Sequence, residues 1–321
     1  MPKAILFSSL SADQNALLLR DAPPGFETRW LPASAPVEEK TAAVRDADFL
    51  LLWGGDVQES VLRAATRLRL IQLFNAGYDQ MNLTLTAELG VPVADNGGAN
   101  ALSVAELTVA LMLAVLRRLI EADRSVRAGR WRGDIKGHEL YELAGKTVGI
   151  VGLGRIGKLV ARRVHAFETE TVYCDQVSDR ELEVALSLRR LPLDELLQRA
   201  DVVTLHVPLA PETRHMIGPQ EIALMRPEAI LINTCRGDVV DEDALVAALR
   251  EGRLRGAGLD VLTKEPCGAD HPLAALPNVV LTPHLGGHSY ESLLRRARFV
   301  WSNVQAVWEG APPQSVVKPN S

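Results

Sequence analysis

The stretch Thr147-Val-Gly-Ile-Val-Gly-Leu-Gly-Arg-Ile-Gly157 decides the fold of this 321-residue chain. Its apolar start, residues 148–151, is typical of a buried strand and runs directly into the glycines Gly152, Gly154 and Gly157, spaced as GxGxxG. The residues that follow, 158–164, have helical spacing. A strand, a tight glycine turn and a helix in this order place a pyrophosphate against the unpaired N–H groups of a helix N-terminus. The pattern therefore predicts a dinucleotide-binding unit.

A second apolar run supports this prediction. Thr171-Val-Tyr-Cys174 is expected to be a strand, and it ends in Asp175, 18 residues beyond Gly157. At about this spacing an acidic side chain accepts hydrogen bonds from the adenosine ribose hydroxyls. The same carboxylate would repel a 2′-phosphate, so the sequence favours NAD over NADP.

Composition limits the classes of protein to consider. The chain is 47% hydrophobic and 23% charged, with a formal net charge of −5 and a pI near 5.9. These values are typical of a globular protein of about two domains, and they favour neither nucleic acid nor a membrane as partner. The longest apolar run, residues 107–116, is too short to cross a bilayer. Three cysteines without CxxC spacing predict no disulfide and no metal site, so we expect a reducing, cytoplasmic setting.

Strand-like runs alternate with helical segments along nearly the whole chain. Besides the two strands already described, we expect strands at 4–7, 28–31, 49–52, 70–74, 91–94, 202–205, 229–233, 256–261 and 279–281. This alternation predicts an α/β fold with two doubly wound parallel sheets. Because the dinucleotide unit lies in mid-chain, we expect a Rossmann domain at 101–287. It would be inserted into a discontinuous, flavodoxin-like substrate domain of residues 1–100 and 288–321.

Two long helices are expected near the domain boundaries. One runs from Ala101 to about Ala128 and ends at Gly129, and the other runs from Ser289 to about Glu309. Both would bridge the two domains, and a small substrate would meet the nicotinamide in the cleft between those domains.

Three charged side chains are placed to act on a 2-oxo acid. Arg236, Glu265 and His284 each follow a predicted strand, so all three should leave the carboxyl edge of one parallel sheet. A guanidinium can hold a carboxylate through two parallel hydrogen bonds. An imidazole can give a proton to a forming alkoxide while a carboxylate behind it fixes its tautomer. Each residue alone is compatible with a structural role, but their conjunction beside a dinucleotide fold favours catalysis.

Over nearly its full length the chain resembles the D-isomer-specific 2-hydroxyacid dehydrogenases, a family that includes D-3-phosphoglycerate dehydrogenases and glyoxylate/hydroxypyruvate reductases. The resemblance rests on the segments 96–106, 143–157, 206–213, 225–241, 258–266 and 278–284. Typical examples are His206-Val-Pro-Leu-Ala-Pro-Glu-Thr213 and Asn278-Val-Val-Leu-Thr-Pro-His284. It implies an oxidoreductase that transfers a hydride between NAD and C2 of a small D-2-hydroxy or 2-oxo acid, and it implies a homodimer formed through the cofactor domain.

The resemblance also implies a role for each site residue. Arg236 would orient the substrate, His284 would be the acid/base, and Glu265 would be the acid paired with it. In the cofactor site, the backbone of Arg155 and Ile156 would contact the pyrophosphate, and Asp175 would bind the ribose. Thr234 and Cys235 would line the nicotinamide, and Asp260 would bind its carboxamide. Gly286 and Gly287 would let the His284 loop close over the nicotinamide ring. The backbone N–H groups of Asn75, Ala76 and Gly77 would hold the substrate carboxylate.

The loop Trp53-Gly-Gly-Asp56 bears on the substrate tail. It has an indole and an acid where phosphoglycerate members of the family have a basic residue. We therefore expect an unphosphorylated substrate with an uncharged or apolar tail beside Trp53. Alternatively, Trp53 packs beneath the loop.

Two further alternatives are open. Cys235 stands where the family usually has a smaller residue; we expect a packed thiol, but the neighbouring Arg236 could lower its pKa and make it sensitive to oxidation.

The chain could also be an NAD-sensing, corepressor-like binding protein of the same fold, without physiological turnover. A metal-dependent dehydrogenase is not supported, because no Cys, Asp or Glu set completes a site with His284 and His288.

Overall fold

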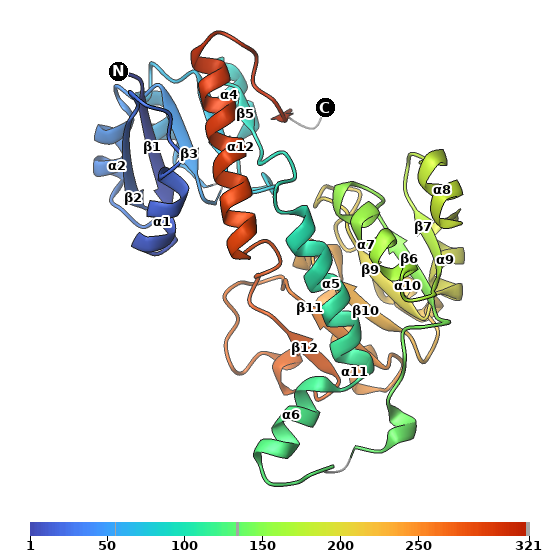
Figure 1. The fold of residues 1–321 in the computed structure, drawn as a ribbon. Coiled ribbons are helices and arrows are strands. Elements are labelled where there is room, and N and C mark those ends of the chain that lie inside the picture. Colours follow the sequence, from blue (N-terminus) through green and yellow to red (C-terminus); the bar gives the residue numbers. More distant parts are fainter. Residues whose placement is uncertain (55, 133–134, 319–321) are drawn as a thin grey trace. The chain divides into compact units, whose positions relative to one another are not determined.

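The computed structural model describes residues 1–54, 56–132 and 135–318, and it divides into two compact units (Figure 1). One unit joins residues 1–100 to residues 288–321, and we call it the split unit. The other comprises residues 101–287, and we call it the central unit.

The split unit is built on a six-stranded sheet of order β13-β5-β4-β3-β1-β2. Its strands are β1 (Lys3–Ser8), β2 (Glu27–Pro32), β3 (Phe49–Leu52), β4 (Leu70–Leu73), β5 (Val93–Ala94) and β13 (Val316–Val317). All pairs are parallel except that of β13 with β5. The order 2-1-3-4-5 of the parallel strands is that of flavodoxin-like sheets.

Helices cover both faces of this sheet, and for that reason β3 is a continuous apolar run and β4 is apolar except for the buried Gln72. The helices are α1 (Ala12–Leu19), α2 (Val37–Val44), α3 (Glu59–Ala64), α4 (Leu83–Glu88) and α12 (Tyr290–Trp308). Leu50, Leu52 and Ile71 pack in the core that includes residues of α2, α3 and α4. Phe49 and Leu51 point to the opposite face, in the core that includes residues of α1 and α12 (Figure 1).

The central unit is built on a seven-stranded parallel sheet of order β12-β11-β10-β9-β6-β7-β8. Its strands are β6 (Thr147–Val151), β7 (Glu170–Cys174), β8 (Arg189–Arg190), β9 (Val202–Leu205), β10 (Ile230–Asn233), β11 (Gly256–Leu259) and β12 (Val279–Leu281). Its helices are α5 (Ala101–Leu116), α6 (Leu119–Arg127), α7 (Arg155–His165), α8 (Arg180–Leu186), α9 (Leu193–Arg199), α10 (Pro219–Leu224) and α11 (Glu242–Arg250), with short 3₁₀ turns at Gly137–Glu139, Gly237–Val239 and Pro272–Ala275. The strand order reverses between β9 and β6, and open α/β sheets bind ligands beyond the carboxyl ends of the strands at such a point.

The predicted α/β class with two parallel-sheet units is confirmed, but one predicted helix is wrong. The segment 101–128 is not continuous, because Arg118 has a left-handed φ of 47° that separates α5 from α6. Its guanidinium donates to Glu121 and Glu139, and these ion pairs hold the bend. The short strands β8 and β13 were not predicted, since two residues show no alternation.

Candidate active site

The glycine loop joins β6 to α7 in the central unit. Gly152 has a φ of 94°, a left-handed conformation that favours glycine. A Cβ on Gly157 would lie 2.1 Å from the carbonyl oxygen of Gly152, so glycine is required for α7 to start this close to β6. A Cβ on Gly154 would meet nothing within 4 Å, so the backbone here borders open space. This space lies at the N-terminus of α7, beside Arg155 and Ile156, and unpaired N–H groups at such a terminus are suited to bind an anion.

Asp175 lies at the carboxyl end of β7, next to this loop. Its carboxylate accepts the backbone N–H of Leu153 at 2.6 Å and the N–H of Val177 at 3.0 Å. The residue is partly exposed. A carboxylate has about four acceptor positions, so capacity remains for the hydroxyls of a ribose.

The segment 234–236 is folded by the last residue of β10. The side-chain amide of Asn233 donates to the carbonyl of Arg236 at 2.8 Å, and its oxygen accepts the N–H of Cys235 at 3.0 Å. The hydroxyl of Thr234 lies 3.0 Å from that of Thr108 on α5. Thr234, Cys235 and Arg236 are thereby fixed at the carboxyl edge of the sheet.

Gly237 brings Arg236 close to the loop that carries Glu265. A Cβ on Gly237 would lie 2.0 Å from the carbonyl carbon of Leu262 and 2.3 Å from the nitrogen of Thr263. These are backbone atoms, which cannot move aside as the end of a flexible side chain can. Glycine at this position therefore allows the two loops to touch.

His284 and Glu265 form a pair at the same edge. The Nδ1 atom of His284 lies 2.7 Å from a carboxylate oxygen of Glu265, whose other oxygen accepts the N–H of Leu262 at 2.9 Å. The side chains are 47% and 36% exposed, so the ring remains accessible. With Nδ1 engaged, Nε2 is the ring atom left for a substrate. His284 has a φ of 54°, a strained conformation for a non-glycine residue and one found at functional sites.

The pKa of Glu265 is below its ordinary value. Burial alone would raise this pKa, but the hydrogen bonds from His284 and Leu262 outweigh it. The positive charge of Arg236 lowers the pKa further, which shows that Arg236 acts electrostatically on the pair. Glu265 is therefore ionised at neutral pH.

Asp260, which directly follows β11, holds the His284 loop in place through hydrogen bonds. Its carboxylate accepts the hydroxyl of Thr282 at 2.6 Å, the N–H of Leu285 at 2.8 Å and the N–H of Gly286 at 2.7 Å. Burial raises its pKa, and these hydrogen bonds oppose the rise. Gly286 and Gly287 are buried in this loop. The bracing role was not predicted from the sequence, which pointed only to a carboxamide partner.

The structure favours the packed thiol for Cys235. The residue packs against the core of the central unit, and burial raises the pKa of its thiol to about 11, although Arg236 lowers it. The sulfur also donates to the side-chain oxygen of Asn233 at 3.1 Å. The raised pKa favours a neutral thiol at pH 7 over the alternative of a thiolate activated by Arg236.

The residues predicted to contact the substrate tail belong to the split unit. Trp53 is only 7% exposed, and its ring packs 5.2 Å from His288, 6.2 Å from Phe74 and 4.7 Å from the Arg296 guanidinium. The side chains around Trp53 therefore hold it in place at the end of β3. This arrangement supports the alternative in which Trp53 packs beneath the loop.

Asn75, Ala76 and Gly77 follow β4 in the split unit and are partly exposed. The side-chain oxygen of Asn75 lies 3.5 Å from the N–H of Gly54, so the 75–77 loop and the loop after Trp53 are neighbours. Gly55, part of that second loop, lies outside the described residues.

His206 was not predicted from the sequence to belong to the site. It follows β9 at the same sheet edge as Arg236, and this is the signal that could have identified it. Its Nε2 lies 3.0 Å from the hydroxyl of Thr204, while its enclosed Nδ1 has no hydrogen-bond partner among the described residues. Burial lowers its pKa to about 3, so the ring is neutral at any working pH.

In residues 1–54, 56–132 and 135–318 no group of three His, Cys, Asp or Glu side chains could hold a metal ion. Within the same ranges, no helix has the length and apolar character needed to span a membrane.

Comparisons with known proteins agree on one family. Residues 109–286 match the "D-isomer specific 2-hydroxyacid dehydrogenase, NAD binding domain". A glyoxylate reductase of Korarchaeum cryptofilum is 40% identical over 91% of this chain and 90% of its own length. A glyoxylate/hydroxypyruvate reductase B of Pectobacterium carotovorum is 37% identical over 99% of this chain and 98% of its own.

Solved structures show the same similarity. The TT0316 protein of Thermus thermophilus superimposes with a TM-score of 0.87 and 37% identity, covering 98% of this chain and 99% of its own. An NADPH-dependent glyoxylate/hydroxypyruvate reductase of Sinorhizobium meliloti, in complex with NADP and malonate, has a TM-score of 0.85 and 28% identity, covering 98% and 96%.

Proposed function

The chain belongs to the D-isomer-specific 2-hydroxyacid dehydrogenase family, and we propose that it transfers a hydride between NAD and C2 of a small 2-oxo or D-2-hydroxy acid. The observation that carries the proposal is the 2.7 Å pair of His284 and Glu265. It stands at the same sheet edge as Arg236 and the glycine loop, so an acid/base, an anion holder and a dinucleotide cradle occur together.

The chain's own residues supply binding and proton transfer. Arg236 holds the substrate carboxylate through charge-assisted hydrogen bonds. His284 donates a proton from Nε2 to the oxygen at C2 during reduction and accepts it during oxidation. Glu265, ionised at neutral pH, fixes the ring through Nδ1 and stabilises its positive charge. The cofactor, when bound, supplies or accepts the hydride.

We propose glyoxylate or hydroxypyruvate as the substrate class. Two observations support it. The side chain at position 53 is itself a buried indole and not a basic group. The relatives from Korarchaeum cryptofilum and Pectobacterium carotovorum named above are a glyoxylate reductase and a glyoxylate/hydroxypyruvate reductase. The backbone N–H groups of Asn75, Ala76 and Gly77 are proposed to bind the carboxylate.

NAD is proposed as the cofactor in preference to NADP. Asp175 presents a carboxylate at the end of β7, where a 2′-phosphate would meet like charge. The similar reductase of Sinorhizobium meliloti was solved with NADP, and comparing NADH with NADPH distinguishes the two cofactors in this chain.

A homodimer formed through the central unit is also proposed. Leu119, Ile120 and Val126 of α6 are 56%, 42% and 50% exposed, an unusual apolar content for the surface of one short helix. Figure 1 shows α6 set apart from the sheet of its own unit, where a partner can cover it. The cytoplasmic setting predicted from the cysteines stays a prediction.

The test is oxidation of NADH, with NADPH in parallel, against glyoxylate, hydroxypyruvate, phenylpyruvate and 3-phosphohydroxypyruvate. We expect turnover with NADH and the two small unphosphorylated acids. Tight NADH binding without turnover on any acid would instead support the corepressor-like alternative.

A further inference from the structure

Arg190, on the edge strand β8, clamps the loop that carries Asp175. Its Nε donates to the carbonyl of Asp175 at 2.9 Å, and its Nη2 donates to the carbonyl of Gln176 at 2.9 Å. The guanidinium thus uses two donors of its rigid fork on consecutive carbonyls. A lysine has one nitrogen and cannot reproduce this geometry.

The same loop is held from the other side by the Asp175 carboxylate. Its oxygens accept N–H groups from Leu153 in the glycine loop and from Val177 two residues further along. Arg190 therefore holds the backbone of Asp175, and Asp175 holds the glycine loop. A shift of the Asp175 backbone would move its carboxylate relative to both.

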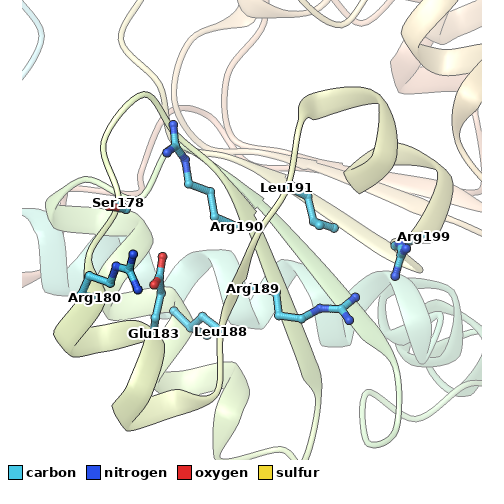
Figure 2. Close-up of a pocket in the computed structure, with 8 residues that line it drawn as sticks. All are labelled: Ser178, Arg180, Glu183, Leu188, Arg189, Arg190, Leu191 and Arg199. Carbon is cyan, nitrogen blue, oxygen red and sulfur yellow. The ribbon is translucent and has the colours of Figure 1, made fainter.

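Arg190 differs in direction from Arg189, its neighbour on the same strand. Arg180, Arg189, Arg190 and Arg199 line a hollow together with Ser178 and Glu183. Figure 2 shows Arg190 extended toward the Ser178 side, whereas Arg189 extends in the opposite direction, as successive residues of a strand do. Arg189 is paired with Glu170 at 3.5 Å instead.

We propose that Arg190 is a positioning residue for the cofactor: it fixes the Asp175 loop so that the carboxylate is pre-set for the adenosine ribose. This inference rests on the proposed role of Asp175 in binding NAD. Arg190 does not touch the reacting atoms, so its loss should weaken NADH binding and leave the chemical step unchanged.

The experiment compares Arg190→Gln and Arg190→Lys with Arg189→Gln, a neighbour on the same strand. NADH affinity is measured by the fluorescence of the bound cofactor, and KM for NADH and kcat are measured with glyoxylate. We expect Arg190→Gln, which cannot reproduce the two-pronged contact, to raise the Kd and KM for NADH about fivefold, the factor that corresponds to the net effect of one hydrogen bond if glutamine retains the other. Its kcat should stay unchanged. Arg190→Lys should behave like Arg190→Gln, and Arg189→Gln like the parent.

Two results would overturn the inference while leaving the proposed function intact. One is an unchanged Kd for NADH in Arg190→Gln when Asp175→Ala weakens binding in the same assay. The other is full rescue by Arg190→Lys, which would show that the charge matters and the fork does not. If the parent protein binds no NADH, the proposed function and this inference fail together.

Discussion

The imidazole of His284 and the carboxylate of Glu265 lie 2.7 Å apart although 19 positions separate them in the chain. Their loops follow two adjacent parallel strands, β12 and β11, and the sheet brings both loops to one edge. Removing the ring removes the proposed proton donor. We expect His284→Ala to lower kcat for glyoxylate reduction by about 10² to 10⁴ and to leave the Kd for NADH nearly unchanged. His165→Ala, an exposed histidine on α7, is the control; full turnover in His284→Ala would refute the assignment.

The pair also sets a dependence of stability on pH. The pKa of Glu265 in the folded protein is below its ordinary value of 4.5, so its ionised form stabilises the fold above that value, and this contribution is lost as the pH falls through the folded pKa. We expect Glu265→Gln to be less stable than the parent at pH 7, with the gap closing in strong acid. Urea denaturation across this range, with exposed Glu142→Gln as the control, measures it. If the difference in the free energy of unfolding between the two proteins grew as the pH fell, the prediction would be wrong.

A substitution at Gly237 tests how closely its backbone must approach the loop that carries Glu265. In Gly237→Ala the new Cβ would meet the Leu262 backbone at 2.0 Å, so the Glu265 loop must shift. We expect a loss of stability of about 1–3 kcal/mol and a lower kcat. Gly154→Ala is the matched control: its Cβ meets no protein atom, so stability should hold while NADH binding weakens. Equal stability of both variants would contradict the proposed crowding.

The cysteines should differ in reactivity. Burial raises the pKa of Cys235 to about 11 and also raises that of Cys174, whereas Cys267 is exposed. Thiolate is the reactive form, so iodoacetamide at pH 8 should label Cys267 and spare Cys235. Mass spectrometry of the peptides reads this out, and Cys267→Ser should abolish the labelling. Rapid labelling of Cys235 would restore the oxidation-sensitive alternative.

The proposed dimer can be tested on α6. A charge at Leu119 would be buried unpaired in an interface, so Leu119→Glu should give a monomer by light scattering. Val184→Glu on α8 is the control, because Val184 is 83% exposed yet stands outside α6. A parent protein that is already monomeric would remove the proposal.

Much of the fold follows from the sequence because buried parallel strands are short apolar runs bounded by turns. The strands Phe49–Leu52, Val202–Leu205 and Val279–Leu281 have the predicted ends. The break between α5 and α6 was not predictable in this way. It depends on Arg118, a good helix former whose left-handed conformation is held by the distant Glu139.

The candidate active site could likewise be predicted from the sequence only in part. The position of Arg236, Glu265 and His284 at one sheet edge was predictable because the ends of parallel strands share an edge, and their catalytic roles stay predictions. Three features depend on contacts that no local pattern encodes: the bracing role of Asp260, the neutral His206 and the Arg190 clamp. The Asp260 and Arg190 contacts join separate strands or loops, and the neutrality of His206 results from its burial.

The edge strand β8 has a consequence for the behaviour of the chain at high concentration. An open sheet edge exposes unpaired N–H and C=O groups, onto which a strand of another molecule can add. Here the edge is two residues long, and both are charged arginines. A strand docking there could pair with two residues at most, and so it would gain few hydrogen bonds. The segment that steadies a cofactor loop is therefore also a poor template for edge-to-edge association.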